Sequence, residues 1–419
     1  MFSKLGAKAY KSDLTNILIL SRLLENPEKK FRSIHIAGTN GKGSTSHMLA
    51  AILQRAGYKT GLYTSPHLYD FRERIRVNGQ MIPESFVTTF TGRLMPTIES
   101  IQPSFFEITV AMAFDWFVEQ QVDIAVIEVG LGGRLDSTNI ILPELSVITN
   151  ISYDHMDLLG NTLQKIAYEK AGIIKPGIPV VIGEEQAEVK EVFIQVAEQN
   201  QAPLSFASRK RFIDDWTFNR HLLEVELTEK HSNEKRNYSL DLPGIYQTKN
   251  IVTVAEAISV LNQQGFKIPE TAIHAGLQNV KKLTGLHGRW DILHDAPLLV
   301  IDVGHNEEGI KEIAKQIEMT SHEELHMVIG MVKDKAIENI LRHLPKTANY
   351  YFTKAQIPRA LSEMELAAKA ESIGLKGKAY PDVRQALQAA LDRAHPKDLV
   401  LVCGSVFLAG EVNIKEMVF

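Results

Sequence analysis

The stretch HIAGTNGKGST, residues 35–45, decides the fold class. It begins in an apolar strand-like run, turns through closely spaced glycines that surround Lys42, and continues into a segment with helical periodicity from Ser44 to Ala56. This order is typical of a phosphate-binding loop, in which backbone N–H groups and the positive end of a helix surround phosphate oxygens. The sequence therefore predicts nucleotide binding, with a plain structural turn as the alternative.

The loop departs from the Walker pattern G-x-x-x-x-G-K-[ST] at two positions. Ile36 stands where the pattern has glycine, and Gly43 stands where it has a hydroxyl residue. The hydroxyl groups therefore come one residue late, and these residues do not distinguish ATP from GTP. We expect phosphate contacts from Asn40, Gly41, Lys42, Gly43, Ser44 and Thr45.

Length and composition describe an ordinary globular chain. Its 419 residues are 44% hydrophobic and 23% charged, which fits two or three domains of roughly 100 to 200 residues each. The net charge of −4 gives no basic field for nucleic acid or an anionic membrane. No run reaches the roughly 18 apolar residues of a membrane span, and residues 1–16 lack the apolar core of a leader, so we expect a cytoplasmic protein. Cys403, inside LVLVCGS, is interpreted as a buried packing residue.

Short apolar runs rich in β-branched residues alternate with helical segments. Continuous runs of this kind are typical of strands buried on both faces of a parallel sheet, so the fold class is α/β. The expected strands of the first series are SIHIAG, KTGLYTS, VDIAVIEVG, LSVITNIS and IPVVIG. The expected helices are 44–56, 106–119, 161–171 and 250–264.

The chain is expected to divide near residue 295, after a linker at 283–291. Residues 205–245 alternate polar and apolar side chains, which predicts an antiparallel appendage. A second α/β series runs from PLLVIDVGHN through HMVIGMVKD and YYFTKA to DLVLVCGS. We therefore predict a P-loop domain with a mostly parallel sheet at 1–295, which includes the appendage, and a smaller Rossmann-like α/β domain at 296–419.

Two candidate metal ligands follow expected strands. Glu128 ends VDIAVIEVG, and the carboxyl ends of parallel strands line the ligand crevice of an open sheet. Mg²⁺ takes hard oxygen ligands, so Glu128 is placed to bind the ion that accompanies a nucleotide, and a merely solvated glutamate is the alternative. His155 in NISYDHMDLLG is either a ligand for a second ion or a surface residue, and Asp154 and Asp157 are carboxylate alternatives.

Lys170 is expected to point inward. In NTLQKIAYEKAGI it stands four residues after Ile166 and three after Ala167, on the apolar face of the expected helix. Burial lowers the pKa of an amine, and an uncharged amine can react with CO₂. The alternative is a side chain whose stem packs on the protein while its ammonium group stays in water.

Several further motifs occur together along nearly the whole chain. They are IHIAGTNGKGST, YTSPHL, FFEITVAMAF, IEVGLGGRLDSTN, ITNISYDHMDLLG, IAYEKAGIIKPG, GRWD and IDVGHN. With them the chain resembles the folylpolyglutamate synthase and dihydrofolate synthase family of the Mur ligase superfamily, and GLGGRLDSTN resembles its bifunctional bacterial members. The resemblance implies an ATP-dependent ligase that adds L-glutamate to dihydropteroate, to the γ-carboxylate of folates, or to both, through an acyl phosphate. We expect a monomer without nucleic-acid or membrane partners.

The resemblance also implies roles for individual residues. It implies ligation of Mg²⁺, two ions in all, by Ser65, Glu128 and His155, and a carbamylated lysine at Lys170. It implies ATP contacts at Asn250, Arg289 and Asp302. It places pterin contacts at Phe105, Phe106, Glu107, Leu135, Asp136 and Ser137. With His305, which follows at the same strand end as Asp302, the expected catalytic set is Lys42, Lys170, His155, Asp302 and His305.

Other interpretations stay open from the residues alone. Asp302 and His305 also fit the cap of a strand-to-helix turn, and the adjacent Phe105 and Phe106 also fit a hydrophobic core. A Mur-type or poly-γ-glutamate ligase with another acceptor is a second possible enzyme, although YTSPHL and GRLDSTN argue against it by resemblance. A nucleotide-switched binding protein is a third possibility, which leaves Lys170 without an explanation.

Overall fold

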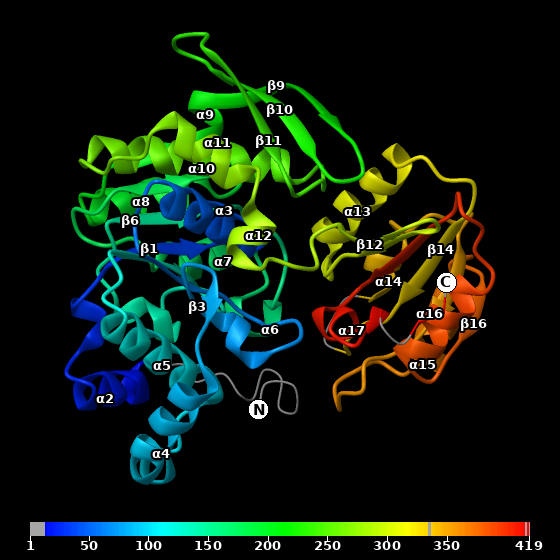
Figure 1. The fold of residues 1–419 in the computed structure, drawn as a ribbon, viewed down its shortest axis with the longest axis horizontal. Helices are drawn as coiled ribbons and strands as arrows, with labels where there is room; N and C mark the ends of the chain where they lie inside the picture. Colours follow the sequence, from blue (N-terminus) through cyan, green and yellow to red (C-terminus); the bar gives the residue numbers. More distant parts are fainter. Residues whose placement is uncertain (1–12, 334–336, 415–416, 419) are drawn as a thin grey trace. The chain divides into compact units, whose positions relative to one another are not determined.

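The computed structural model describes residues 13–333, 337–414 and 417–418, which form two compact units. The first unit holds 13–241 and 246–286, and the second holds 242–245 and the described residues from 287 onward (Figure 1). Most of residues 1–16, on which the expectation about a leader rests, lies outside the described residues. Within the described ranges, none of the helices combines the length and apolar character that crossing a membrane requires.

The main sheet of the first unit is mostly parallel, as the apolar runs predict. Among the described residues it has eight strands in the order β4-β3-β2-β5-β1-β6-β7-β8, and only β3 and β4 pair antiparallel, at one edge. The strands are β1 (Arg32–Ala37), β2 (Thr60–Tyr63), β3 (Ile75–Val77), β4 (Gln80–Met81), β5 (Ile124–Glu128), β6 (Leu145–Ile148), β7 (Val180–Ile182) and β8 (Leu204–Phe206).

Helices cover both faces of this sheet. On one face lie α3 (Lys42–Arg55) and α10 (Gln247–Gln263), with α11 (Glu270–Leu277) and α12 (Val280–Thr284) against α3. The other face carries α2 (Thr15–Leu23), α4 (Glu84–Ile101), α5 (Phe105–Glu119), α7 (Leu163–Ala171) and α8 (Lys190–Gln199). The four predicted helices are confirmed as α3, α5, α7 and α10, with ends shifted by a few residues. Short turns are η2 (Pro27–Lys29), η3 (Phe71–Arg74), η4 (Ser137–Ile140), α6 (Met156–Leu159) and α9 (Ala207–Lys210).

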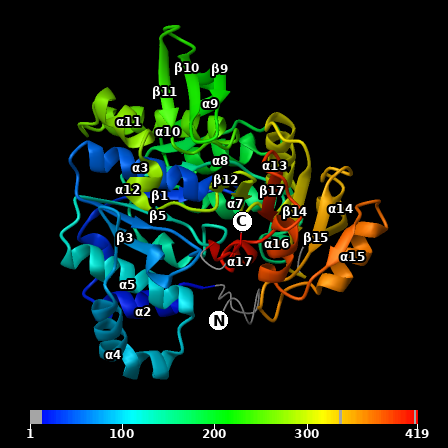
Figure 2. The ribbon, with the colours of Figure 1, turned by 45° about the vertical axis from the view of Figure 1, so that its right-hand side comes forward.

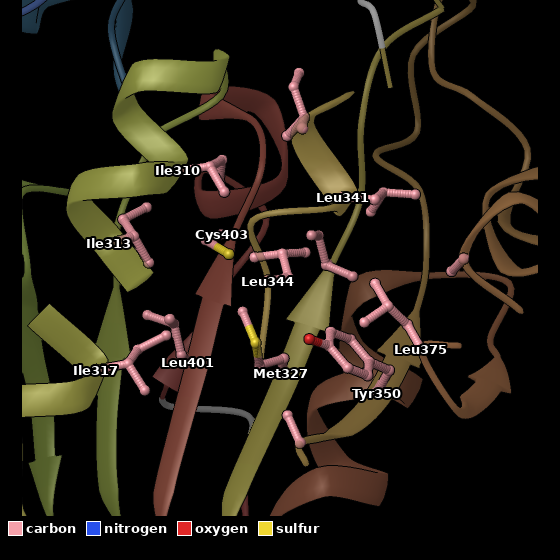
Figure 3. Packing of buried hydrophobic residues seen from close by; sticks show 14 of the residues in the cluster. Ile310, Ile313, Ile317, Met327, Leu341, Leu344, Tyr350, Leu375, Leu401 and Cys403 are labelled. Atoms are coloured by element: carbon pink, nitrogen blue, oxygen red, sulfur yellow. The ribbon is translucent and has the colours of Figure 1, made fainter. Parts of the chain in front are cut away.

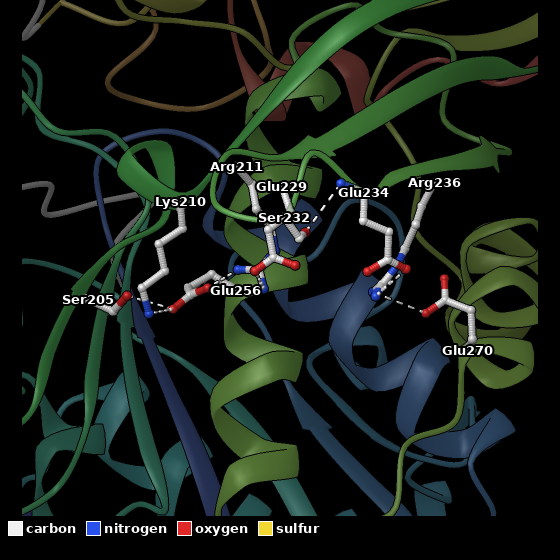
Figure 4. Close-up of polar contacts among 9 residues, drawn as sticks. All are labelled: Ser205, Lys210, Arg211, Glu229, Ser232, Glu234, Arg236, Glu256 and Glu270. Atoms are coloured by element: carbon white, nitrogen blue, oxygen red, sulfur yellow. Dashed lines mark hydrogen bonds and ion pairs between the residues drawn. The ribbon is translucent and has the colours of Figure 1, made fainter.

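The predicted antiparallel appendage is confirmed as a three-stranded sheet in the order β11-β10-β9. Its strands are β9 (Arg211–Phe218), β10 (Leu223–Glu229) and β11 (Lys235–Leu240), and they lie beyond α10 and α11 from the main sheet (Figures 1 and 2). Glu256 of α10, fully buried, attaches it (Figure 4). Its carboxylate pairs with Arg211, with Lys210 at 2.8 Å and with the Ser205 hydroxyl at 2.6 Å.

The second unit is a smaller, mostly parallel α/β domain. Among the described residues its strand order is β12-β13-β17-β14-β15-β16, with only β12 antiparallel. The strands are β12 (Asp291–Asp295), β13 (Leu298–Ile301), β14 (Leu325–Ile329), β15 (Asn349–Phe352), β16 (Gly377–Ala379) and β17 (Leu399–Cys403). The helices are α13 (Glu307–Met319), α14 (Ile337–Leu341), α15 (Glu363–Glu371), α16 (Val383–Leu391) and α17 (Val406–Ala409).

One hydrophobic core holds the second sheet to its helices. Ile310, Ile313 and Ile317, one stripe of α13, pack on strand residues such as Leu401 (Figure 3). Cys403 lies fully buried in the same cluster, and burial raises the pKa of its thiol, which confirms the packing interpretation. The described chain belongs to this unit from residue 287 onward, whereas the sequence suggests a boundary near 295, because β12 pairs with β13 and so belongs to this sheet.

Candidate active site

The phosphate-binding loop joins β1 to α3 at the carboxyl end of a central strand. Gly41 precedes α3 with a φ of 83°, a conformation that favours glycine. A Cβ on Gly41 would lie 2.3 Å from Oδ1 of Asn250, and a Cβ on Gly38 would lie 1.9 Å from Oγ1 of Thr149. Side chains are therefore excluded at both positions, so the backbone itself forms this part of the loop surface.

The first turn of α3 contains Lys42, Gly43, Ser44 and Thr45. The Ser44 hydroxyl accepts a hydrogen bond from Nε2 of Gln247 at 3.1 Å. The Thr45 hydroxyl is buried and has no hydrogen-bond partner among the described residues. An unsatisfied hydroxyl at the positive end of a helix fits a bound anion or a cation that accompanies it. The loop therefore fits a nucleotide phosphate with its metal ion.

Residues after β6 hold the loop in shape. The backbone N–H groups of Thr39 and Asn40 donate to the backbone oxygen and to Oδ1 of Asn150, both at 2.9 Å. The Thr149 hydroxyl donates to the carbonyl oxygen of Asn40 at 2.5 Å. Asn40 thus supports the loop from within, and its contact with phosphate stays a prediction.

Two lysine side chains meet behind this loop. Nζ of Lys42 donates to the carbonyl oxygens of Gly38 at 2.9 Å and Thr39 at 3.0 Å, and Nζ of Lys170 donates to the same Gly38 oxygen at 2.9 Å. Lys170 is 4% exposed, which confirms that it points inward. Burial, and then the charge of Lys42, lower the pKa of Lys170 to about 7. A large fraction of this amine is therefore uncharged near neutral pH.

Glu128 lies one strand away from the loop. It is the last residue of β5, beside Ile36 of β1, and is 4% exposed. Its Oε2 accepts from the backbone N–H of Ser65 at 3.1 Å, in the segment that follows β2. Because β2, β5, β1 and β6 are neighbours in the sheet, their carboxyl ends bring Ser65, Glu128 and the loop to one edge.

His155 follows β6 at the same edge. Its φ of 51° is uncommon outside glycine, and its Nε2 lies 3.9 Å from Oδ1 of Asp154. Among the described residues no group of three or more His, Cys, Asp and Glu side chains is arranged to hold a metal ion. Mg²⁺ needs no such group, since one or two carboxylates, a hydroxyl and substrate phosphates are enough. The donors at this edge fit that chemistry.

The first turns of α10 and α5 contain further predicted contacts. Asn250 is 7% exposed and donates through Nδ2 to Oε1 of Gln247 at 2.7 Å. In α5, Phe106 packs against the core and over Gly130, as the core interpretation has it. Phe105 is 37% exposed, and its contact with a ligand stays a prediction.

Glu107 and Asp136 have local structural partners. Glu107 and Ser104 form a capping box at the start of α5, with the Ser104 N–H donating to Oε2 of Glu107 at 2.6 Å. The Asp136 carboxylate accepts from the Leu131 N–H at 2.9 Å and from the Thr138 hydroxyl at 2.5 Å, and burial raises its pKa. Both carboxylates shape the backbone here. Their contact with substrate stays a prediction, as it does for the half-buried Leu135 and Ser137.

Within the second unit, Asp302 ties a strand end to the segment before β12. Its two carboxylate oxygens accept from the backbone N–H groups of Trp290 and Gly304, both at 2.8 Å. Arg289, next to Trp290, is half-buried and donates to the Gly288 oxygen at 3.2 Å. The bond from the Trp290 N–H to Asp302 brings the backbone beside Arg289 close to Asp302, although the two bonded residues are twelve positions apart in the sequence.

His305 precedes the helix α13, and its Nδ1 lies 3.0 Å from the Val303 oxygen. The residue that caps α13 is Asn306, which accepts from the Gly309 N–H at 2.8 Å. Asp302 and His305 both bond within the turn from β13 to α13, as the alternative interpretation has it, whereas Asn306 caps the helix itself. Their roles toward ATP stay predictions.

Sequence reasoning missed a buried arginine on which the charge of Glu128 acts. Arg74, the last residue of η3, is 9% exposed and donates through Nε to Nδ1 of His67 at 2.8 Å. Nothing in FRERIRV distinguishes Arg74 from Arg72 or Arg76. The nearby YTSPHL motif was the only available signal.

Two family models match the chain, one in each compact unit. The Mur ligase middle domain matches residues 36–258, and the Mur ligase, glutamate ligase domain matches residues 288–406. The first match contains the phosphate-binding loop, Glu128 and Lys170. Fold and site therefore define an ATP-dependent ligase of the Mur class.

Comparison with individual proteins narrows this class. The chain is 34% identical to the dihydrofolate synthase/folylpolyglutamate synthase of Bacillus subtilis over 416 residues, 96% of this chain and 94% of the relative. It belongs to the dihydrofolate synthase/folylpolyglutamate synthase family, and it is an ATP-dependent glutamate ligase.

Solved structures agree with this assignment. Escherichia coli FolC in complex with DHPP and ADP has a TM-score of 0.84 and 31% identity, covering 98% of this chain and 94% of that one. The Yersinia pestis bifunctional enzyme complexed with AMPPNP and Mn ion has a TM-score of 0.82 and 28% identity, covering 97% and 94%. The predicted fold class and enzyme class are thus confirmed, and ATP with a divalent metal ion is supported.

Proposed function

We propose that this chain joins L-glutamate to dihydropteroate and to the γ-carboxylate of folates, with ATP as the phosphoryl donor. The observation that carries the proposal is the edge of the main sheet, where the loop, the Glu128–Ser65 contact and the buried Lys170 converge. The relative from Bacillus subtilis is named for both activities, and the Escherichia coli structure contains DHPP and ADP.

The chain's own groups bind and orient the substrates. Lys42 exchanges its contacts with Gly38 and Thr39 for phosphate oxygens, and the loop N–H groups hold the same phosphates. Ser65, Glu128 and His155 are the proposed ligands for two Mg²⁺ ions, in keeping with their donor atoms. Bound Mg²⁺ supplies neutralisation of the phosphoryl charge. ATP contacts from Asn250, Arg289 and Asp302, and a catalytic role of His305, belong to the same proposal.

The proposed chemistry has two displacements. An oxygen of the substrate carboxylate attacks the γ-phosphorus, and the bond from phosphorus to the bridging oxygen breaks. ADP departs, and the product is an acyl phosphate. The amine of L-glutamate then attacks the acyl carbon, phosphate leaves, and the nitrogen loses its proton as the amide forms. The protein contributes positioning and electrostatics rather than a covalent bond.

A carbamate on Lys170 is part of the proposal. The uncharged amine adds to CO₂, forms an N–C bond and releases one proton, and the pKa of about 7 makes that form available. The new carboxylate on Lys170 would attract the ammonium group of Lys42, which the unmodified amine repels when it is charged. It would also provide an oxygen ligand for a metal ion. The pterin is assigned to Phe105, Phe106 and Glu107 and to 135–137.

Phosphate release from ATP tests the proposal. The rate is measured with L-glutamate and Mg²⁺ while the acceptor is dihydropteroate, tetrahydrofolate, a muramyl peptide or absent. We expect release, and product of the matching mass, with the first two acceptors only. Equal rates without an acceptor would end the ligase proposal, and turnover of the muramyl peptide alone would reassign the acceptor. Sedimentation and cell fractionation test the proposed monomer and its cytoplasmic location.

A further inference from the structure

Arg74 is a buried cation whose hydrogen-bond partner is neutral. Its Nε donates to Nδ1 of His67 at 2.8 Å, and the nearby phenol of Tyr63 acts on its pKa. Among the described residues, no carboxylate forms an ion pair with Arg74 within 4.0 Å. Arg72, two residues earlier, pairs with Asp70 at 2.7 Å and with Glu84 at 3.1 Å.

The partners of Arg74 are themselves oriented. The Thr109 hydroxyl donates to the Phe106 carbonyl oxygen at 2.9 Å, so it accepts from the Tyr63 hydroxyl, 3.1 Å away. The Tyr63 oxygen therefore keeps acceptor capacity for a nearby donor such as the guanidinium of Arg74. The hydrogen bond to His67 and the burial of Arg74 restrict the guanidinium before any ligand binds.

A buried cation without an anion is unfavourable. Desolvation costs several kcal/mol per buried ion, and neutral partners recover only part of it. Burial accordingly lowers the pKa of Arg74, and the negative charges of Glu128 and Glu73 offset part of this shift. An arginine stays charged even so, because its ordinary pKa lies above about 12. The structure thus keeps a positive charge in place that an incoming anion would stabilise.

Arg74 also lies near two residues of the proposed site, Phe105 and Glu128. Its guanidinium carbon is 5.5 Å from the ring centroid of Phe105, whose ring in turn packs edge-on against Phe71. The charge of Glu128, a proposed metal ligand, also acts on Arg74. A substrate whose flat ring contacts Phe105 would carry an attached carboxylate toward the guanidinium.

We propose that Arg74 binds the carboxylate of the acceptor, the group that becomes phosphorylated, and that Tyr63 and His67 position Arg74 for this contact. The inference rests on the proposed function and adds a residue to it. Two N–H groups of a planar guanidinium fix a carboxylate in its own plane, which directs one oxygen toward the γ-phosphorus. Arg74 stays protonated throughout and transfers no proton.

Binding of a matched ligand pair tests the contact directly. Pteroic acid and its carboxamide share every ring and differ in one charge, so their affinity ratio measures recognition of the carboxylate. Dissociation constants for both are measured by calorimetry with the full chain, for wild type, Arg74→Gln and Arg74→Lys. Arg72→Gln is the matched control, because Arg72 lies in the same turn and pairs with Asp70 and Glu84.

The affinity ratio is expected to depend on Arg74 alone. Wild type and Arg72→Gln should prefer the acid at least tenfold, Arg74→Gln should bind both ligands within about twofold, and Arg74→Lys should fall between them. In turnover, Arg74→Gln should raise KM for the acceptor at least tenfold and leave KM for ATP within about threefold.

Each other outcome decides against one proposal. If Arg74→Gln keeps the wild-type preference for the acid, Arg74 does not contact the carboxylate. If wild type binds neither pterin and releases phosphate with no pterin acceptor, the proposed function fails instead. If Arg74→Gln does not fold, Arg74→Lys still decides, because wild-type preference in that variant shows that the planar guanidinium is not required.

Discussion

Lys42 and Lys170 donate to the same carbonyl oxygen, that of Gly38, each at 2.9 Å. One lysine comes from the first turn of α3 and the other from the end of α7, so only the tertiary fold brings them together. Two cations that share one acceptor repel each other, and burial adds to the effect. The position of Lys170 is therefore electrostatically unfavourable and points to a chemical role rather than a stabilising one.

Replacing Lys170 with methionine should separate these roles. Lys170→Met keeps the length and apolar stem but removes the buried amine, so the free energy of unfolding should stay equal or rise by about 1 kcal/mol. Ligase turnover should fall at least 100-fold, about 3 kcal/mol of transition-state stabilisation. Urea unfolding and phosphate release measure the two effects. Lys165→Met, an exposed change on the same helix, is the control, and wild-type turnover in Lys170→Met would exclude the role.

Removal of CO₂ should inactivate the enzyme reversibly if Lys170 is carbamylated. Buffer depleted of CO₂ and bicarbonate lets the carbamate decompose to the amine, and the rate should drop severalfold and recover when bicarbonate returns. The residual rate of Lys170→Met should not respond. Mass spectrometry of the native protein should show a loss of about 44 Da on depletion, the mass of one CO₂. A rate indifferent to bicarbonate would count against the carbamate.

Alanine at Gly38 should disrupt the loop more than alanine at a glycine with open space. A Cβ at Gly38 would lie 1.9 Å from Oγ1 of Thr149, whereas a Cβ at Gly57, where φ is 92°, would meet no neighbouring side chain or backbone within 4 Å. Gly57→Ala should cost only backbone strain, about 1 kcal/mol of unfolding free energy. Gly38→Ala should also weaken binding of a non-hydrolysable ATP analogue at least tenfold. Equal analogue affinity in both variants would contradict the steric argument.

Loss of Glu256 should destabilise the first unit strongly. Its carboxylate is 1% exposed, and its removal leaves Arg211, 8% exposed, without its buried partner. Glu256→Ala should lower the free energy of unfolding by about 3 kcal/mol. Glu234→Ala, which breaks an exposed pair with Arg236, should cost no more than about 1 kcal/mol. Urea unfolding followed by circular dichroism compares them, and similar losses would mean that Arg211 finds another partner.

His35 should make stability fall in acid. Nε2 of His35 lies 2.9 Å from the Thr138 hydroxyl, which itself donates to Asp136, so Nε2 carries the proton and the buried Nδ1 has no partner among the described residues. Burial, and then the charge of Lys175, lower the pKa of His35 from 6.5 to about 3. The unfolded chain therefore takes up a proton below pH 6.5 that the folded chain refuses until about pH 3.

The free energy of unfolding should fall by about 1.4 kcal/mol per pH unit from this group as the pH drops below 6.5. His35→Asn keeps a donor toward Thr138 but cannot titrate, so wild type should lose about 2 kcal/mol more than this variant between pH 6.5 and 5. Urea unfolding at several pH values measures the slopes. His231→Asn, at an exposed position, should behave like wild type. Equal slopes for wild type and His35→Asn would show that His35 takes up a proton in the folded protein without lowering the free energy of unfolding.

Much of the fold follows from local patterns. The apolar β-branched runs identify strands such as β1 and β5, and periodicity identifies α3, α5, α7 and α10, because burial on both faces or on one stripe leaves a direct mark on the sequence. The short edge strands β3 and β4 carry no such mark and were not foreseen. The second sheet also includes β12, which lies before the expected boundary near 295, because β12 pairs with β13 as an antiparallel hairpin.

The site divides in the same way. A glycine-rich turn between a strand and a helix, a glutamate at a strand end and a lysine on an apolar helix face are local facts, so the sequence by itself determined the loop, Glu128 and the inward direction of Lys170. Only the tertiary structure decided that Lys170 and Lys42 share the Gly38 oxygen, and that Arg74 is buried with no ion-pair partner in the described part of the chain while Arg72 is paired. Charge interactions depend on distance and burial across the fold, and the spacing of residues along the chain predicts neither.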